Sequence, residues 1–295
     1  MAESTVHGMN LRRKAVVAWG RVKDYSLEFP TASCEDEALA AAQSHIDQAY
    51  ASLPPVSQHD QRLVDFLHHD CEMKLEHTDG SFMDHLSFGN EYAARHFKEY
   101  SPRVLLLHSI MGLGTNHFPM EAEKIPRLRE LVTEFEMRHV ESFPSIVRLW
   151  AHGRLSAKLL SCSSPELCNG LKGISFHRVI DNRRLWMDAD SFWIHLNYQL
   201  MHYIDFFPAF GWSTSRDPGM IVFRLLCTEL ISVLERAGKL LVNLEFEPRL
   251  TVGELPTPLA LSRRMQRWEK ISKKIGHSLD FELIWEEGLV NDGLR

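Results

Sequence analysis

Cysteine is scarce in this sequence, and its arrangement excludes small disulfide-rich or zinc-knuckle scaffolds. The 295 residues include five cysteines, an odd number, and no two of them form a CxxC pair. The first residues, MAESTVHGMNLRRK, contain no apolar run of the kind that signal peptides carry. These absences favour a protein of the reducing cytoplasm, and we expect this localisation.

An excess of positive charge and a long uncharged apolar run are also absent. The chain has 33 basic and 39 acidic residues, which argues against a dedicated nucleic-acid-binding protein. Residues 220–244 are the most apolar stretch, but five charged side chains within it exclude a transmembrane helix. Phosphate-binding and dinucleotide-binding glycine motifs and the GxSxG elbow are missing too.

The pattern that is present predicts an all-α protein, because strands alternating with helices are not evident. Apolar periodicity and composition predict helices over residues 36–52, 57–73, 81–100, 123–142, 144–160, 188–207, 219–242 and 259–275, and a loop over 161–175. The run VLLLHSIM (104–111) fits a buried strand or a buried helix, and its helical neighbours favour the helix.

Three parts follow from the composition along the chain. Residues 1–56 form an N-terminal arm and helix, 57–245 a central helical domain, and 246–295 a linker and a basic C-terminal helix. That last helix places Met265, Trp268, Ile271 and Ile275 on one face. It either packs this face on its own domain or contacts an anionic membrane or a partner protein.

Histidine, with 16 occurrences, supplies the first candidate site. The segments HTDGSFMDHL and LLLHSIMG present His77, Asp84, His85 and His108. Imidazole and carboxylate groups are the usual ligands of Zn, Fe and Mn, because both offer lone pairs at neutral pH. The alternative is that the histidines in apolar surroundings are core residues bonded to backbone carbonyls.

The helix expected over 188–207 supplies the second candidate site. His195, Gln199, His202 and Asp205 follow one another at spacings that place all four on one face of an otherwise apolar and aromatic helix. This polar stripe either meets the first histidine group and completes a metal or substrate site, or it is simply solvated on a half-exposed helix.

The segments HTDGSFMDHL, LLLHSIMG and IPRLRELVTEFEMRHVESF, in that order, resemble an uncharacterised helical family at the edge of the HD (His-Asp) metal-dependent phosphohydrolase superfamily. The resemblance is good over residues 75–143 and faint beyond them. It implies an HD-domain-like helical bundle with N- and C-terminal extensions, in which one or two metal ions are bound by histidines and aspartates.

Carried over residue by residue, the resemblance makes His85 the first histidine, His108 the histidine of the His-Asp pair and Asp205 the late aspartate. Ser109 stands where the paired aspartate belongs. A serine hydroxyl is a poor ligand for a divalent ion, so the site has either kept a single metal with the help of His77 and Asp84 or lost its metal.

The resemblance therefore implies a metal-dependent enzyme, a hydrolase or an oxygenase, acting on a small organic or phosphorylated substrate. His77, His85, His108 and Asp205 would hold a divalent metal (Fe, Mn or Zn), and Asp84 or His202 would act as general base or orient a ligand. The aromatic richness of 186–212 and the lack of a basic cluster near the motif suit an apolar organic molecule. The alternative is a metal-free helical protein that uses a histidine-lined pocket for acid–base chemistry or small-molecule binding.

Overall fold

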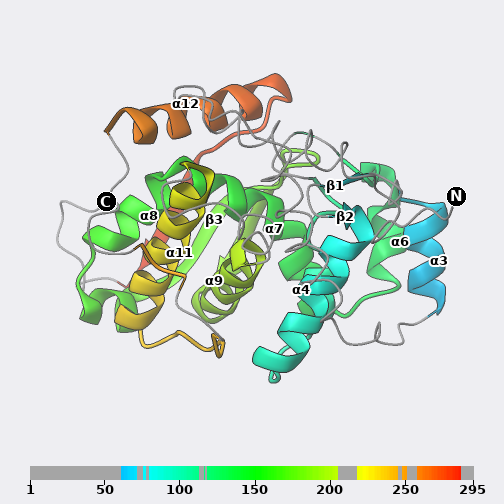
Figure 1. Ribbon diagram of the computed structural model, residues 1–295, viewed down its shortest axis with the longest axis horizontal. Coiled ribbons are helices and arrows are strands. Elements are labelled where there is room, and N and C mark those ends of the chain that lie inside the picture. Colours follow the sequence, from blue (N-terminus) through cyan, green and yellow to red (C-terminus); the bar gives the residue numbers. More distant parts are fainter. Residues whose placement is uncertain are drawn as a thin grey trace, which may run out of the picture.

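A computed structural model describes residues 61–71, 76–77, 80–112, 116, 118–204, 218–244, 248–250 and 258–286. Most of these residues are helical, and a small sheet closes one side of the molecule (Figure 1). The helices are α3 (Gln61–His69), α4 (Phe82–His96), α5 (Arg103–Leu107), α6 (Ile125–Arg129), α7 (Glu134–His152), α8 (Arg154–Ser161), α9 (Ala189–Ile204), α11 (Pro218–Arg236) and α12 (Pro258–Lys274), with the short turns η2 (Ala122–Lys124) and η3 (Glu166–Gly170). The strands are β1 (Glu76–His77), β2 (Gly80–Ser81), β3 (Leu171–His177), β4 (Arg184–Asp188) and β5 (Phe281–Trp285).

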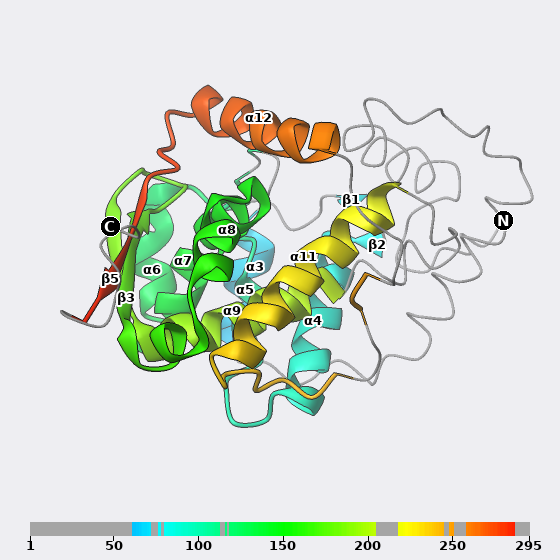
Figure 2. The ribbon, with the colours of Figure 1, turned by 90° about the vertical axis from the view of Figure 1, so that its left-hand side faces the viewer.

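The prediction of an all-α fold is wrong, because β3, β4 and β5 form an antiparallel sheet in the order β4-β3-β5. Its inner face buries Ile174, Met187 and Leu283, which lie opposite one another in the three strands. Figure 2 shows β3 and β5 side by side at one edge of the molecule. The fold is therefore mixed, with helices on the inner side of the sheet.

Gly173 explains why the first residues of β3 fall within the loop that the sequence predicts over 161–175. A Cβ atom at this position would lie 2.4 Å from the carbonyl oxygen of Met187 on the neighbouring strand, which is too close for any side chain. Glycine is therefore needed here for the close approach of two strands, whereas glycine in a short polar segment is ordinarily read as a turn. The residues before β3, from 161 to the turn η3, contain no strand, which agrees with that part of the expected loop.

The helices expected over 123–142 and 144–160 have different boundaries in the structure. A break comes at Thr133, whose side chain accepts a hydrogen bond from the Glu136 backbone N–H while the Glu136 carboxylate accepts one from the Thr133 N–H. This capping box starts α7, which continues through Pro144 and ends at Gly153, a residue with a positive φ of 98°. Pro144 thus lies inside α7 instead of separating two helices.

The other helices in the described part of the chain lie close to their predicted positions. These are α3, α4, α9, α11 and α12, and the apolar run at 104–111 begins with the helix α5, as its neighbours favoured. Residues 1–35 and the helix expected over 36–52 lie outside the described residues.

Two apolar clusters form the core, and α5 and α7 contribute to both. Val104 of α5 and Phe143 of α7 belong to the larger cluster, which includes α8, α9, α11 and the inner face of the sheet. Leu107 of α5 and Met137 of α7 belong to the smaller cluster with α3 and α6. Consecutive residues of α5 thus pack into two different apolar clusters, so this short helix connects the two parts of the core.

The C-terminal helix α12 packs its apolar face on its own domain. Trp268 is buried in the larger cluster, and Arg264 pairs with Glu229 of α11 at 3.1 Å. Arg264 also donates hydrogen bonds to the carbonyl oxygens of Trp150 and Ala151, the last turn of α7. One guanidinium therefore joins α7, α11 and α12. Among the helices in the described ranges, none combines the length and the hydrophobicity needed to span a bilayer.

A buried histidine cluster as the candidate functional site

Three histidines from α9 and the turn after α5 lie against the ring of Phe143, and a fourth, His139 of α7, joins them through His195. We call His108, His139, His195 and His202 the histidine cluster. The Phe143 ring centroid lies 4.8 Å from that of His108, 5.2 Å from His195 and 5.5 Å from His202. The rings of His108 and His202 are themselves 4.6 Å apart, centroid to centroid. The cluster thus joins a segment before residue 112 to two later helices.

Hydrogen bonds within the cluster determine which nitrogens carry protons. The Gln199 side-chain N–H₂ donates to the carbonyl oxygen of Phe143 at 3.2 Å, so its second hydrogen points to His195 Nε2 at 3.0 Å. His195 Nε2 therefore accepts, and in the neutral ring its proton is on Nδ1. That Nδ1–H donates to His139 Nδ1 over 3.1 Å. His139 consequently holds its own proton on Nε2, a buried atom without a hydrogen-bond partner among the described residues.

Burial keeps the two deep histidines of the cluster neutral. It lowers the pKa of His139 from 6.5 to about 3, with the positive charge of Arg138 as a smaller cause. The pKa of His195, which has no exposed surface, is also lowered far below its usual value by burial and by the neighbouring His139. Both rings are therefore uncharged at neutral pH and act as hydrogen-bonding groups instead of cations.

His108 has its orientation fixed by its own chain segment. Its Nδ1–H donates to the carbonyl oxygen of Leu105 over 2.6 Å, so the neutral ring carries its lone pair on Nε2. This bond to a backbone carbonyl is what the interpretation of His108 as a core residue expects, and it is also the usual arrangement of a metal-ligating or proton-accepting ring. Ser109, in place of the expected aspartate, is buried next to it.

Of the predicted site residues, the structure brings together His108 and His202. His77 lies in β1, paired with Gly80 in β2, directly before α4, and Asp84 and His85 lie in the first turn of α4. The side chains of these three residues, and all of Asp205, lie outside the described part of the structure. Within the described residues, no group of three or more His, Cys, Asp or Glu side chains is placed to hold a metal ion. The predicted ligand set thus stays a prediction.

The backbone nevertheless carries His85 toward His108. Helix α4 packs on α5 with Gly89 against Leu105, since a Cβ at Gly89 would lie 3.2 Å from Leu105 Cβ. His85 is four residues before Gly89 in α4, and His108 is three residues after Leu105. Leu86 and Leu107 share the smaller apolar cluster, which agrees with this antiparallel alignment.

The polar stripe of α9 is buried, so the interpretation of a solvated stripe is wrong for its described members. His195 and Gln199 are fully enclosed, and His202 is half-buried beside His108. His139, which shares a hydrogen bond with His195, is not among the site residues that the sequence predicts. The signal was a polar residue between Met137 and Val140 on the apolar side of α7, four residues before Phe143.

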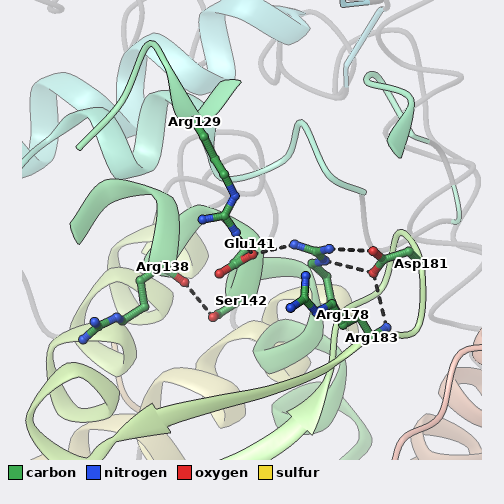
Figure 3. A network of polar contacts seen from close by, with 7 residues as sticks. All are labelled: Arg129, Arg138, Glu141, Ser142, Arg178, Asp181 and Arg183. Carbon is green, nitrogen blue, oxygen red and sulfur yellow. Dashed lines mark hydrogen bonds and ion pairs between the residues drawn. The ribbon is translucent and has the colours of Figure 1, made fainter. Parts of the chain in front are cut away.

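A second polar group lies on the other side of α7 and is ionic (Figure 3). Arg178, in the β3–β4 turn, donates to Glu141 of α7 at 2.5 Å and to both carboxylate oxygens of Asp181. Arg129 reaches Glu141 at 3.1 Å. We call Arg129, Glu141, Arg178 and Asp181 the ionic network. The hydrogen bonds that Arg178 donates lower the pKa of Asp181, and the same bonds and the negative charges of Asp181 and Glu141 raise the pKa of Arg178.

No protein-family model, curated protein or solved structure matches this chain. The function is therefore argued from the site itself.

Proposed function

We propose that this chain is a metal-dependent enzyme of the HD-like type, which hydrolyses or oxygenates a small organic or phosphorylated molecule in the cytoplasm without a nucleic-acid partner. The observation that supports the proposal best is the orientation of His108. Its Nδ1–H is held by the carbonyl oxygen of Leu105, its lone pair is on Nε2, and the His202 ring lies 4.6 Å away. Neutral imidazoles in this state are the form that binds transition metals.

In this proposal His108 binds the ion together with His77, His85 and Asp205, while His202 or Asp84 accepts a proton. The described donors fit in part, since His108 has a ligand's tautomer and His202 is beside it. A bound divalent ion would supply the acidity that turns water into a nucleophile at neutral pH. The chain's own contribution is to fix His108 through the carbonyl oxygen of Leu105, to keep His139 and His195 neutral by burial and to exclude bulk water with Phe143.

The substrate is more consistent with an organic molecule than with a phosphate ester. The two cations nearest the motif are already engaged: Arg103 donates to the carbonyl oxygen of Leu131 at 2.8 Å and approaches Glu136, and Lys124 donates to the carbonyl of Asp70 at 2.6 Å. A phosphate clamp normally needs such groups directed at the ligand. The aromatic ring of Phe143 in the cluster instead favours an apolar substrate.

The second candidate function is a metal-free pocket that uses the histidines for acid–base chemistry. The chain Gln199–His195–His139 favours it, because direct hydrogen bonds of 3.0 and 3.1 Å link these three side chains. His139 ends the chain with a buried Nε2–H, which is a donor suited to a substrate oxygen.

Elemental analysis of the purified, untagged protein tests the metal proposal. We expect a near-stoichiometric transition metal in the wild type and its loss in His108→Phe, because phenylalanine keeps the ring packing and removes the lone pair. The matched control is His277→Phe, since His277 is also buried and bonded through Nε2 to the carbonyl oxygen of His177 but lies outside the cluster. The control should retain the metal.

Two results would overturn the metal proposal. One is a wild-type protein that takes up no metal even after incubation with Fe, Mn or Zn salts. The other is equal metal loss in His108→Phe and His277→Phe with unchanged circular dichroism. Activity or ligand binding that survives chelation but disappears in His139→Phe would support the metal-free pocket instead.

A further inference from the structure

Strand β4 forms an open edge of the three-stranded sheet. In the order β4-β3-β5 it pairs with β3, and its other side faces no strand of the described ranges. Arg184 and Trp186 of this strand are exposed, Trp186 to 58% of its surface. Backbone N–H and C=O groups along such an edge are available to another strand.

The β4 edge lacks the features that commonly protect a sheet edge. At the opposite edge, the pairing of β5 with β3 has a register shift between Leu171 and Gly173, whereas β4 pairs with β3 residue for residue. Such an irregularity twists an edge away from a further strand. The segment RLWMD of β4 also contains no proline, glycine or lysine. Its exposed indole leaves the edge open, because Trp186 Nε1 lies 3.2 Å from where a Cβ of Gly173 would be, over the middle strand.

The pairing with β3 determines which backbone groups of β4 point to the open side. The Arg183 carbonyl oxygen accepts a hydrogen bond from the Arg178 N–H at 2.8 Å, so it points toward β3. The Met187 carbonyl oxygen, which closely approaches Gly173, also points toward β3. Because this direction alternates along a strand, every second residue directs its N–H group away from β3. These residues are Arg184, Trp186 and Asp188.

The charges at the two ends of β4 are complementary to those of a second copy of the strand. Arg184 and Asp188 lie two residues before and after Trp186, on the same face of the sheet. If two β4 strands pair antiparallel with Trp186 opposite Trp186, Arg184 of each copy lies opposite Asp188 of the other. Within their own chain these side chains pair with Glu282 and Arg138, but all four are at least 35% exposed, so these pairs stabilise the fold little.

We propose that β4 pairs with β4 of a second copy of this chain, so that two three-stranded sheets form one sheet of six strands across a twofold axis. A strand with the same charge at both ends would repel its own copy in this register, whereas opposite charges attract. Because the strand is short, the interface is small and the dimer dissociates reversibly in the micromolar range. This inference does not depend on the metal site, which lies in the interior.

Sedimentation equilibrium of the full-length protein tests the proposal. We expect a concentration-dependent dimer of the wild type. Arg184→Asp and Asp188→Arg each place like charges opposite one another at both ends of the interface, so each should weaken the dimer at least about tenfold. An equimolar mixture of the two variants should dimerise as the wild type does, because the heterodimer again pairs an acidic with a basic side chain at both ends.

Asp188 also accepts a hydrogen bond from the Ser191 N–H at the start of α9, so Asp188→Arg is checked by circular dichroism. If this variant loses its helical signal, Trp186→Pro replaces it, because proline removes an N–H that points to the open side and no bond to β3. Its control is Trp186→Thr, which keeps the N–H. The threonine variant should dimerise and the proline variant should not.

The matched control for Arg184→Asp is Arg127→Asp, which changes the net charge equally at an exposed ion pair of α6 and should leave the dimer intact. Three results would overturn the proposal. They are a wild type that is monomeric at about 100 µM, equal weakening by Arg184→Asp and Arg127→Asp, and no recovery in the mixture of variants. Equal dimerisation of Trp186→Pro and Trp186→Thr would overturn it as well.

Discussion

Two polar regions lie on opposite sides of α7 and show two ways of keeping polar groups inside a protein. His139 faces α9, shares a hydrogen bond with His195 and is kept neutral mainly by burial. Glu141, only two residues later, faces the β3–β4 turn and is held as an anion by Arg178 and Arg129. His139 and His195 avoid charge, and the ionic network balances it.

The difference follows from the side chains that surround each side of α7. Around His139 the neighbours are aromatic rings, and desolvation, reinforced by the charge of Arg138, outweighs the opposing charge of Asp188. Around Glu141 two arginines supply charge and hydrogen bonds, and Arg129 keeps half of its side chain in water. The two sides of α7 thus provide different surroundings, one that favours a neutral ring and one that pairs a carboxylate with arginines.

The largest expected effect is a pH dependence that separates the two regions. The folded-state pKa of His139 is about 3 and that of His195 is also far below 6.5, so the unfolded chain takes up protons first as the pH falls. Stability should therefore be complete above about pH 6.5 and fall by about 1.4 kcal/mol per pH unit for each ring below it, about 4 kcal/mol in total near pH 5. Urea unfolding across this range measures the loss.

The ionic network should not contribute to that loss. Because the pKa of Asp181 is lowered from 3.8, its stabilisation is present above this value and disappears only as the pH falls below it. The variant His139→Phe/His195→Phe should accordingly make the profile less steep between about pH 6.5 and about pH 5, and the remaining slope should come from His277 and His152, whose pKa values burial also lowers. A wild-type profile that is already flat there would contradict the neutral state of the two rings.

Arg178→Met is expected to have the next largest effect. It leaves Glu141 and Asp181 without their shared cation in a mostly enclosed site, and we expect a loss of about 3 kcal/mol in the free energy of unfolding. Arg127→Met is the control, because the ion pair of Arg127 with Glu130 is exposed and should be worth less than about 0.5 kcal/mol. Similar losses in the two variants would mean that burial of the network does not matter.

A smaller effect is expected from breaking the histidine pair. His139→Phe removes the acceptor for the His195 Nδ1–H and should cost about 2 kcal/mol at neutral pH, and His195→Phe should cost a similar amount. The double variant should cost clearly less than the sum, since no buried ring is then left without its partner. Additive losses in a double-mutant cycle of urea midpoints would exclude the hydrogen bond between the rings.

The helices could be predicted from sequence because their signals are local. The apolar periodicity of residues 57–73 or 219–242 needs no knowledge of the rest of the chain, and α3 and α11 lie there. Thr133 and Glu136 also form a local capping signal. The sequence analysis nevertheless expects the helix boundary next to Pro144, because proline commonly interrupts a helix. Proline is tolerated inside α7 by contacts that a one-dimensional pattern does not contain.

The sheet and most of the site depend on contacts between distant residues, so they could not be predicted. Gly173 is required by Met187 on another strand, and β3 also needs β5 from the end of the described chain. The burial of the α9 stripe depends on His139, fifty-six positions earlier than His195. His108 and His202 were both selected from sequence, but only the fold brings their rings together.

The order of the strands has a consequence for how the protein is made. The middle strand β3 leaves the ribosome together with β4, but β5, its other neighbour, follows only after about a hundred further residues. During that interval the edge of β3 that pairs with β5 has no partner strand, and the apolar surface that Leu283 covers in the folded protein is exposed. The nascent chain is therefore most exposed to aggregation in the interval between the synthesis of β4 and that of β5.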